Sequence, residues 1–579
     1  MKQAETETQQ SQLANVRAIF EVLAGDREAD LLLRNLNILD VHGETVYQGS
    51  ILVYDKRIVA LNPDESAIRV KEIFDGQGLY AIPGLIDAHL HFESQLAHPT
   101  ALAEAMVPCG TTTIFAECLD LLSAAGDDGV RAAQLLFRDY DKLPYRLYAF
   151  APGKKTAAWV TKEVLEMEPV IGLGEFEHFT YSKGDEDDFR KAAWVRAKGG
   201  FMNGHWGLTA LPDMVLNYLP AIGVSNNHDV WNGDDIAKSI RYGFPTQIKF
   251  GVGSSEVIKT LLRSIVDRKF PTENFMLCTD NISIERLQKM GHMDWIISLC
   301  AEMGISPIKA IKMATYNTAK SYNMDDRIGS LTPGRFADIV LTDSLSSINP
   351  RYVFKDGELI AKDRKLLKNA DTDYSAMCTP GVPGADDLKP EELDLAPLEL
   401  SEDGTLAKVY LFDVYGRGHA KFYQEVWVPF QGGKVVPEYE GERFSRLSVI
   451  RRYADGNRHV VNGLFKGVYA ERGAVATSFP APIPYFVVVG QDSEEMHYCV
   501  QEVDKYSGAC IVTEDHMHKS VMPIEIYGMM ANMTVDELTS SAAAIDSALE
   551  DLGNRNEGEP VVNKLLSLFI SLHRFRFMQ

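Results

Sequence analysis

Short apolar runs separated by turn residues flank the central part of the chain. On the N-terminal side they occupy residues 31–33, 50–54 and 57–61. Runs of this kind predict β-strands. The pattern returns at residues 337–341 and 352–354, followed by Asp356-Gly357, a dipeptide typical of a hairpin turn. The two flanks therefore predict one small β-sandwich, over residues 31–82 and 326–368, with another domain inserted between them.

Between these flanks, apolar strands alternate with helical stretches. The eight predicted strands are residues 86–91, 111–117, 146–150, 170–176, 200–206, 222–228, 246–251 and 275–280. Eight such units over residues 83–325 predict an α/β fold, a TIM-like (β/α)8 barrel, with a doubly wound sheet as the alternative. We favour the barrel because the polar residues of interest follow strand ends, which meet at one mouth in that fold.

The C-terminal third of the chain has a different character. Residues 369–400 are rich in Asp, Pro and Gly and predict a linker. Mixed strand and helix patterns follow over residues 401–579, which predict a separate α+β domain. We expect this domain to contribute to the fold rather than to the chemistry.

Composition and charge narrow the class of protein. The chain has 579 residues, a hydrophobic share of 45% and a formal charge of −23. Such acidity argues against general affinity for nucleic acid or anionic membranes, because phosphate binding needs clustered Lys and Arg. Seven cysteines without regular spacing indicate a reducing compartment. Since no apolar run is long enough to cross a membrane, we expect a cytoplasmic protein.

The N-terminal extension, residues 1–30, is polar and charged around an apolar centre, Ile19–Leu23. It is too short and too acidic for a secretory signal. We expect residues near Ala14 to Leu23 to form a docked helix or an oligomer contact. A large acidic cytosolic protein with such a helix is a candidate homodimer.

The run from Pro83 to His91 carries the first candidate chemistry, because it ends in His-x-His. Side chains alternate along a strand, so His89 and His91 point the same way. Neutral imidazole is a common ligand of zinc, iron and manganese. A metal site is therefore the leading interpretation, and two surface histidines at a strand end are the alternative.

Further polar residues follow other predicted strands, and they are Glu175, His205, His228 and Asp280. Four imidazoles and two carboxylates exceed the needs of one tetrahedral ion, so the sequence predicts a binuclear centre with Glu175 bridging. Any single residue of the six could be a satisfied core residue. Six buried polar residues without a role in one barrel mouth would be costly, which favours the metal centre.

A series of motifs runs through the whole chain in a consistent order. They are Pro83–Ser94, Gly110–Thr113, Gly172–Glu175, Gly204-His205, His228-Asp229, Cys278–Asp280, Gly291–Asp294, Ala314–Ala319, Gly329–Leu341, Gly463–Gly467, Arg472–Ala476 and Val487–Gly490. In order and spacing they resemble the adenine deaminases of the amidohydrolase superfamily. The segment His89-x-His91-x-Glu93-Ser94 looks more like adenine deaminases than like dihydropyrimidinases, which commonly use a carboxylated lysine where this chain has Glu175.

The resemblance implies a metal-dependent aminohydrolase that releases ammonia from an aminated ring. It implies two divalent metal ions, manganese or iron with zinc as a further option, held by His89, His91, Glu175, His205, His228 and Asp280. Metal binding lowers the pKa of water enough to make hydroxide available near neutrality. Asp280 is then expected to take a proton from the nucleophile, and Glu175 to help carry protons toward the departing ammonia.

Substrate contacts are expected from Glu93, Ser94, His292 and Trp206. Trp206 could stack on a planar ring together with Phe176, although packing of the barrel mouth accounts for both equally well. His292 either hydrogen-bonds the substrate or a ligand, or has a structural role in capping a helix, since Gly291-His292 suits a loop-to-helix boundary.

Several positions depart from the family pattern on the substrate side. Glu117–Asp120 stands where the family has Asp-Pro-His-Glu, and Gly251–Ser254 stands where it has Arg-Glu-Gly-Ser. Cys278–Ile282 replaces the family's Cys-Thr-Asp-Asp-Arg, and Ala481–Tyr485 replaces its His-Asp-Ser-His-Asn. Retention of the candidate metal ligands together with changes at the expected substrate contacts indicates altered substrate specificity. We therefore expect a substituted purine, a pterin-like ring or a cyclic amide rather than plain adenine. Hydrolysis within a cyclic amide or amidine ring, without ammonia release, is one alternative function, and a non-catalytic metal-binding relic is another.

Overall fold

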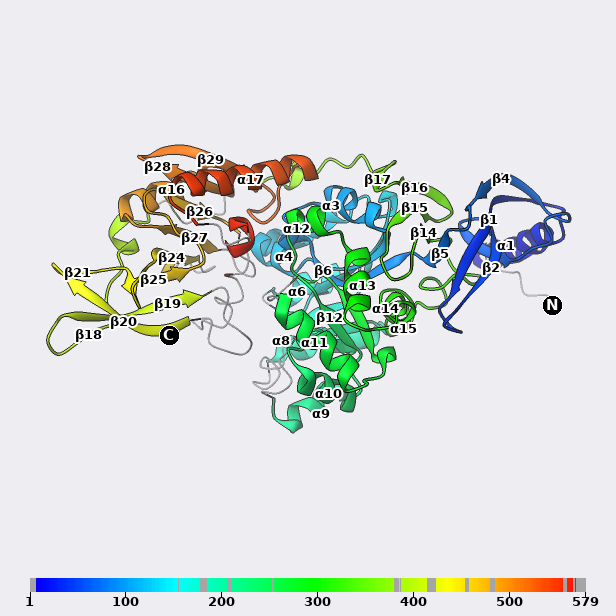
Figure 1. Cartoon of the computed structure of the whole chain (residues 1–579), viewed down its shortest axis with the longest axis horizontal. Helices are drawn as coiled ribbons and strands as arrows, with labels where there is room; N and C mark the ends of the chain where they lie inside the picture. The colour runs from blue at the N-terminus through cyan, green and yellow to red at the C-terminus, as the bar shows by residue number, and fades with distance from the viewer. Residues whose placement is uncertain are drawn as a thin grey trace.

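The computed structural model describes residues 7–154, 156–176, 185–205, 211–251, 255–379, 385, 387–413, 423–452, 458–479, 485–555, 560–565 and 568. Three bodies lie in a row: a β-sheet body at the N-terminal end, a barrel in the centre and a C-terminal domain (Figure 1). None of the helices in the described part of the chain combines the length and apolar character that crossing a bilayer requires.

Strands from both predicted flanks build one mixed sheet. Within the described residues its nine strands are β1 Glu28–Asp40, β2 Thr45–Tyr54, β3 Arg57–Leu61, β4 Arg69–Asp75, β5 Tyr80–Pro83, β14 Ile339–Thr342, β15 Pro350–Lys355, β16 Glu358–Lys362 and β17 Lys365–Leu366. The flanks join where β5 and β14 pair in antiparallel fashion, with Ala81 opposite Leu341. Apolar side chains from both flanks share one core. The two flanks therefore meet in one sheet, with the barrel inserted between β5 and β14.

The predicted hairpin turn between β15 and β16 has the expected backbone. Asp356 and Gly357 have φ angles of 54° and 80°. Positive φ at both central residues is what a type I′ turn requires, and it explains why an Asp-Gly pair occupies this position.

The N-terminal helix α1, Glu7–Leu23, begins before the predicted start at Ala14. It packs on the sheet through Val22, which is fully buried in a cluster with Leu32 and Leu52. Asn15 Nδ2 donates a hydrogen bond of 3.3 Å to Asp55 in the β2–β3 turn. The helix is therefore fixed to the sheet along one face.

The central domain is a nearly closed parallel barrel. Its eight strands in the described residues are β6 Leu85–His91, β7 Thr111–Glu117, β8 Arg146–Pro152, β9 Val170–Phe176, β10 Phe201–Gly204, β11 Asn226–Asn227, β12 Thr246–Lys249 and β13 Phe275–Cys278. Neighbouring strands follow chain order throughout. The backbone N–H of Asp280, just after β13, donates to the carbonyl of His89 on β6 at 2.9 Å, which brings the first and last strands together. This topology excludes a doubly wound sheet and confirms the TIM-like barrel.

The sixth strand is shorter than predicted. The sequence predicts a strand over residues 222–228, but only Asn226–Asn227 pair as β11. Ile222 instead ends helix α9, Asp213–Ala221, and Gly223 follows in a left-handed turn with φ 98°. Apolar character alone could not separate the end of this buried helix from the start of the strand.

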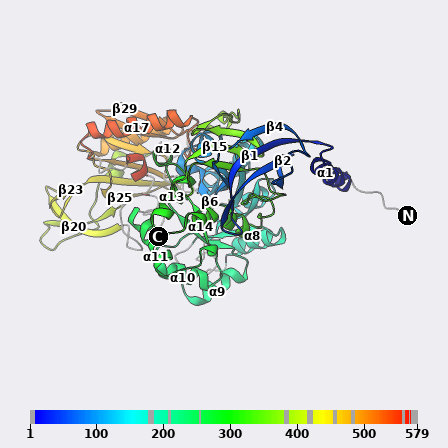
Figure 2. The same cartoon turned by 45° about the vertical axis from the view of Figure 1, so that its right-hand side comes forward.

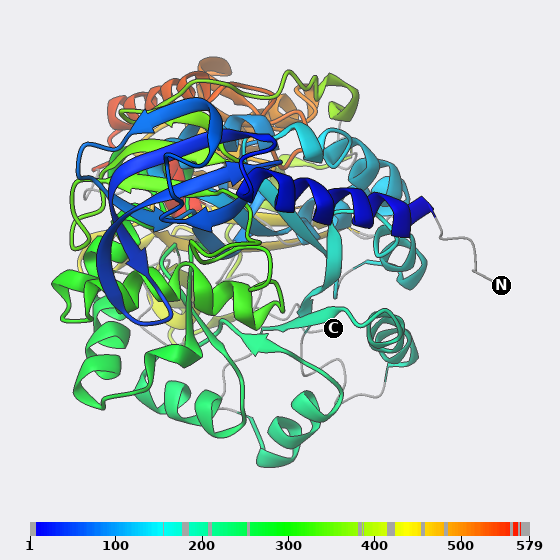
Figure 3. The same cartoon turned by 90° about the vertical axis from the view of Figure 1, so that its right-hand side faces the viewer.

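Helices cover the outside of the barrel (Figure 3). Besides α9, they are α2 Phe92–Gln95, α3 Pro99–Met106, α4 Leu119–Ala125, α5 Gly129–Leu136, α6 Ala158–Val164, α8 Glu186–Ala197, α10 Gly233–Arg241, α11 Ser255–Asp267, α12 Ile284–Met290, α13 Met293–Glu302, α14 Pro307–Met313 and α15 Tyr316–Ser321. Their apolar faces and the outward side chains of the strands form the largest core of the molecule.

The C-terminal domain is α+β, as predicted. Its strands in the described residues are β18 Glu399–Leu400, β19 Leu406–Asp413, β20 Tyr423–Gln431, β21 Lys434–Val435, β22 Glu438–Tyr439, β23 Glu442–Arg443, β24 Ser445–Arg452, β25 Arg458–Lys466, β26 Ala474–Thr477, β27 Tyr485–Gly490, β28 Ala509–Glu514 and β29 Met517–Pro523. Alternate residues of β26 pack on α16, Ser493–Lys505, and on the core that contains α17, Val535–Asp551. The two helices therefore cover opposite faces of the main sheet.

The C-terminal domain also covers the turn that follows β6. The backbone N–H of Ala531 donates to the carbonyl of Leu96 at 2.8 Å. Leu96 has a left-handed backbone with φ 57°, and its side chain belongs to the same core as Met530 and Ala531. The segment directly after the His-x-His strand is thus held between two domains.

His98 lies beside this junction in an environment that suits only the neutral ring. Its Nδ1 accepts from the Ala101 N–H at 3.2 Å, which caps α3, and its ring stacks on Tyr374 of the linker with centroids 4.7 Å apart. Burial lowers the pKa of His98 from 6.5 to about 4. Between these pH values the folded protein binds fewer protons than the unfolded chain, so stability falls as the pH falls.

We expect His98→Asn to make the protein less sensitive to acid, because asparagine can still cap the helix but does not titrate. Between about pH 7.5 and pH 5, the free energy of unfolding of the wild type should fall by about 2 kcal/mol more than that of the variant. Guanidinium unfolding of both proteins at the two pH values measures this difference. Parallel losses of stability would contradict the assignment.

Candidate metal centre and active site

All six predicted ligands lie at the C-terminal ends of barrel strands. His89 and His91 lie at the end of β6, and Glu175 is the penultimate residue of β9. His205 and His228 directly follow β10 and β11, and Asp280 is the second residue after β13. Five of the six are buried, and His205 is partly exposed. The barrel topology therefore brings together residues that are far apart in the sequence.

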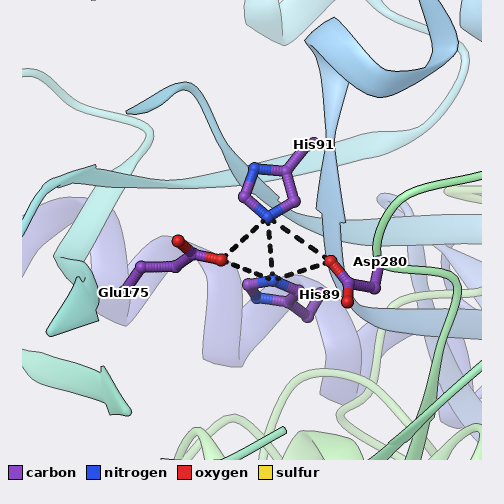
Figure 4. Close-up of side chains that lie close together, drawn as sticks. All are labelled: His89, His91, Glu175 and Asp280. Carbon is purple, nitrogen blue, oxygen red and sulfur yellow. Dashed lines mark hydrogen bonds and ion pairs between the residues drawn. The ribbon is translucent and has the colours of Figure 1, made fainter. Parts of the chain in front are cut away.

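His89, His91, Glu175 and Asp280 form the first cluster (Figure 4). The Nε2 atoms of His89 and His91 are 3.2 Å apart. Glu175 Oε1 lies 3.1 Å from His91 Nε2 and 3.9 Å from His89 Nε2. Asp280 Oδ1 lies 3.5 Å from His91 Nε2 and 3.7 Å from His89 Nε2. Two imidazoles and two carboxylates thus point at a common centre.

Glu175, His205 and His228 form a second cluster that shares Glu175 with the first. The same Oε1 atom of Glu175 lies 3.3 Å from His205 Nδ1 and 3.6 Å from His228 Nε2. These two nitrogens are 2.8 Å apart. One carboxylate oxygen therefore faces four imidazoles from two adjoining clusters.

The donor set fits divalent metal ions. Imidazole nitrogens that converge at about 3 Å need a proton or a cation between them, and each cluster adds at least one carboxylate as a counter-charge. The Nδ1 atoms of His89, His91 and His228 are buried without a hydrogen-bond partner, so these rings present Nε2 to the clusters. Nitrogen and carboxylate ligands together suit zinc, iron and manganese.

The backbone at two of the carboxylates is unusual. Glu175 and Asp280 have φ angles of 36° and 56°, in the left-handed region that non-glycine residues rarely adopt. Such conformations persist where the surrounding structure enforces them, and they concentrate at functional sites. At both strand ends the chain turns so that the carboxylate enters the barrel mouth.

Two buried lysines hold the far oxygens of the same carboxylates. Lys154 Nζ lies 2.8 Å from Glu175 Oε2, and Lys249 Nζ lies 3.6 Å from Asp280 Oδ2 and 3.2 Å from Asp229 Oδ1. Neither lysine belongs to the motifs recognised in the sequence. Because Lys249 ends β12 and Lys154 follows β8, the strand-end criterion that identified the ligands would also have identified them.

The charges of the cluster support one another. Burial opposes ionisation of Glu175, but Lys154, His205 and His91 hold the pKa of this carboxyl well below its usual value. Burial also opposes charging of His91, yet Glu175 and Asp280 raise the pKa of this ring to about 10. Burial lowers the pKa of His228 to about 4. The protein therefore maintains an ionised Glu175 at the centre of the site.

A third carboxyl, Glu117 at the end of β7, lies beside the first cluster, with Oε1 3.7 Å from His89 Nδ1. Asn203 Nδ2 donates to its Oε1 at 3.3 Å, and its Oε2 is buried without a hydrogen-bond partner. Burial and the nearby Glu175 raise the pKa of Glu117 to about 8. The group is therefore protonated near neutral pH, which relieves repulsion between the two carboxyls.

The second glycine of the Gly172–Glu175 motif makes room for Glu117. A Cβ atom at Gly174 would lie 1.6 Å from Glu117 Oε2, and the next nearest atoms also belong to Glu117. We expect Gly174→Ala to destabilise the protein by about 1–3 kcal/mol through overpacking. Combined with Glu117→Ala, which removes the clashing atoms, the same substitution should cost much less. Unfolding midpoints of both single variants and the double variant test this, and purely additive losses would contradict it.

Two of the predicted substrate-binding residues, Glu93 and Ser94, hydrogen-bond to other parts of the protein. Glu93 is buried, and its Oε1 accepts from the Leu121 N–H at 2.7 Å; burial, with Asp120 nearby, raises the pKa of Glu93 to about 7. Ser94 Oγ hydrogen-bonds to Asn281 Oδ1. These two side chains tie α2 to the segments after β7 and β13. Trp206 lies outside the described residues.

His292 is fully buried, and its two ring nitrogens face protein groups. Nδ1 lies 2.7 Å from Thr111 Oγ1, and Nε2 lies 3.1 Å from Asp87 Oδ2. Asp87 Oδ1 in turn accepts from the backbone N–H of His89 at 3.1 Å. This geometry favours the structural alternative for His292. The residue precedes α13, but its side chain makes no capping hydrogen bond. Through Asp87 it instead supports β6, the strand that carries His89 and His91.

Comparison with known proteins agrees with this architecture. Residues 226–360 match the amidohydrolase family, and residues 423–572 match the adenine deaminase C-terminal domain. An adenine deaminase from Desulforamulus reducens is 32% identical over 554 residues, which cover 93% of this chain and 92% of that protein. Adenine deaminases from Kosmotoga olearia and Paracoccus denitrificans are 27% and 28% identical, over 93% and 95% of this chain and 92% and 93% of their own lengths. The similarity extends over nearly the whole chain.

Proposed function

Because this chain belongs to the adenine deaminase family of metal-dependent hydrolases, we propose that it removes the exocyclic amino group of a purine or related heterocycle and releases ammonia. The observation that carries the proposal is the position of Glu175 Oε1, which lies between 3.1 and 3.9 Å from nitrogens of four histidines. A shared carboxylate between two histidine pairs is the arrangement expected of a binuclear centre.

We assign the six ligands to two divalent metal ions, manganese or iron with zinc as a further option. His89, His91 and Asp280 would hold one ion, His205 and His228 the other, and Glu175 both. When bound, such ions make water nucleophilic near neutral pH and stabilise the negative charge that develops on the substrate.

Asp280 is the proposed proton acceptor. Its Oδ1 faces the histidine pair, whereas its Oδ2 faces Lys249 and so has a fixed orientation. The proton that Asp280 takes from water must reach the departing amine for ammonia to leave. Glu175, anchored by Lys154, lies across the same centre and would assist that transfer.

The substrate is expected to differ from plain adenine. Where the family pattern has a histidine, this chain has Leu119, which is buried at the start of α4 and offers no polar contact. Loss of polar groups on the substrate side favours a substituted purine or a larger heterocycle. Hydrolysis within a cyclic amide or amidine ring uses the same centre and is the second candidate.

Ammonia release from a panel of compounds tests the proposal. Adenine, substituted aminopurines, aminopterins and cyclic amides would be incubated with protein loaded with manganese, iron or zinc, with Asp280→Asn as the blank. Ammonia from a substituted purine in preference to adenine would support both the reaction and the substrate class. A kcat/KM for adenine of about 10⁴ M⁻¹s⁻¹ or more would contradict the substrate class. Ring-opened product without ammonia would identify a ring hydrolase, and no turnover by fully loaded protein would overturn the proposed function.

A further inference from the structure

His89 has a ring nitrogen that the metal clusters do not use. Its Nε2 faces the first cluster (Figure 4), whereas its Nδ1 is buried and has no hydrogen-bond partner in the described part of the chain. A neutral imidazole that binds a metal ion through Nε2 carries its proton on Nδ1. A buried N–H without an acceptor costs free energy, so the ligand role of His89 requires an acceptor beside Nδ1.

Glu117 is placed to be this acceptor. Its Oε1 lies 3.7 Å from His89 Nδ1, and both side chains are fully buried. A hydrogen bond needs about 3.2 Å or less, so a small movement of either side chain would form one. The strand β6, which carries His89, lies in the interior of the molecule among the helices of the barrel (Figure 2). Bulk solvent therefore cannot take the place of Glu117 as the acceptor.

A hydrogen bond at Nδ1 would decide which edge of the His89 ring faces the first cluster. The ring stacks on His228 with centroids 4.1 Å apart, which fixes the plane of the ring. Stacking is equally compatible with a ring turned over about its Cβ–Cγ bond, in which carbon atoms replace Nδ1 and Nε2. With Nδ1 held toward Glu117, Nε2 stays directed at the cluster.

A row of buried polar side chains inside the barrel holds Glu117 in place. Asn203 Nδ2 donates to Glu117 Oε1 at 3.3 Å. Asn203 Oδ1 in turn accepts from Asn226 Nδ2 at 2.8 Å and from the Tyr322 hydroxyl at 3.3 Å. The interiors of such barrels are filled mainly by branched apolar residues, and buried polar groups are costly unless they are paired. The row therefore gives Glu117 an orientation that apolar packing could not supply.

We propose that Glu117 is a positioning residue for His89. By accepting the Nδ1 proton it keeps Nε2 directed at the first cluster and strengthens metal binding there, although Glu117 itself belongs to neither cluster. A carboxyl oxygen can accept a hydrogen bond whether or not the group is ionised, so the site needs an acceptor in this place rather than a charge. The inference rests on the proposed function, because it is as a metal ligand that His89 needs this orientation.

The metal affinity of the full-length protein, first stripped of metal, tests this role. Manganese or zinc would be titrated in competition with a chromophoric chelator, and thermal unfolding would confirm that each variant is folded. Glu117→Leu should weaken binding about 10- to 100-fold, whereas Glu117→Gln keeps an acceptor oxygen and should stay within about threefold of the wild type. Glu502→Leu is the matched control and should bind metal as the wild type does, because Glu502 is also buried beside a histidine, 2.8 Å from His518, but in the C-terminal domain.

Asn203→Ser provides a second test that does not depend on the folding of Glu117→Leu. Serine lacks the amide that holds Glu117, so binding should weaken about threefold to tenfold. Combined with Glu117→Leu it should cause no further loss, because both changes act through one contact. Wild-type affinity in Glu117→Leu or in Asn203→Ser, or equal weakening by Glu117→Gln and Glu117→Leu, would overturn the inference. Wild-type protein that binds no metal would instead contradict the proposed function.

Discussion

Replacement of Glu175 with glutamine is expected to remove activity by a factor of about a thousand or more and to reduce the metal content of the protein. Glutamine has the same shape but no charge. The Oε1 atom that faces four histidines would lose its negative charge, and the buried Lys154, 2.8 Å from Oε2, would lose the charge of this partner. Both metal clusters share this carboxylate, so a single substitution weakens both.

Elemental analysis of metal per chain and ammonia release would be measured on the same preparations. Glu502→Gln is the matched control, because Glu502 is also buried and pairs with His518 at 2.8 Å, but in the C-terminal domain. Retention of wild-type metal content and activity by Glu175→Gln would refute a shared ligand, and equal losses in Glu502→Gln would show that the effect is not specific to the site.

Asp280→Asn should separate catalysis from metal binding. Asparagine keeps an oxygen near His89 and His91 but cannot accept a proton, so kcat should fall by about 10²–10⁴ while KM changes little. His89, His91 and Glu175 remain in the first cluster, and we expect most of the metal to be retained.

Measurements of single-turnover ammonia release and of metal content distinguish loss of the proton acceptor from loss of the metal site. Asp343→Asn serves as the control, since Asp343 makes a surface ion pair of 3.5 Å with Arg351. Wild-type kcat in Asp280→Asn would exclude Asp280 as the proton acceptor. Loss of metal together with activity would instead indicate that Asp280 acts mainly as a metal ligand.

The strands with clear apolar patterns were predictable from the sequence. The predicted limits of residues 111–117 and 170–176 coincide with β7 and β9, because both strands are apolar runs bounded by turns. The barrel order then placed His89, Glu175 and Asp280 in one mouth. The pattern failed at β11, where polar asparagines form the strand and the preceding apolar residues belong to a helix.

Strand-end position marks Lys154 and Lys249 as candidate site residues, but it does not predict which groups they contact. Lysine is seldom buried, so residue type alone would place both on the surface until the carboxylates that neutralise them are known. The role of His292 depends on Asp87, a partner distant in sequence and adjacent only in the fold. Metal ligands can be inferred from residue type and strand ends, whereas the groups that orient them require the three-dimensional pairing.

The pairing of β5 with β14 has a consequence for the order in which the chain folds as it is synthesised. β5 leaves the ribosome long before β14, because the entire barrel is translated between them. During that interval the N-terminal sheet has an exposed edge, which can pair with other chains. The barrel must therefore be made before that edge closes, and a product that stops before residue 339 would be prone to aggregate. Correct folding of this protein therefore requires that the edge strand β5 does not pair with another chain before β14 has been synthesised.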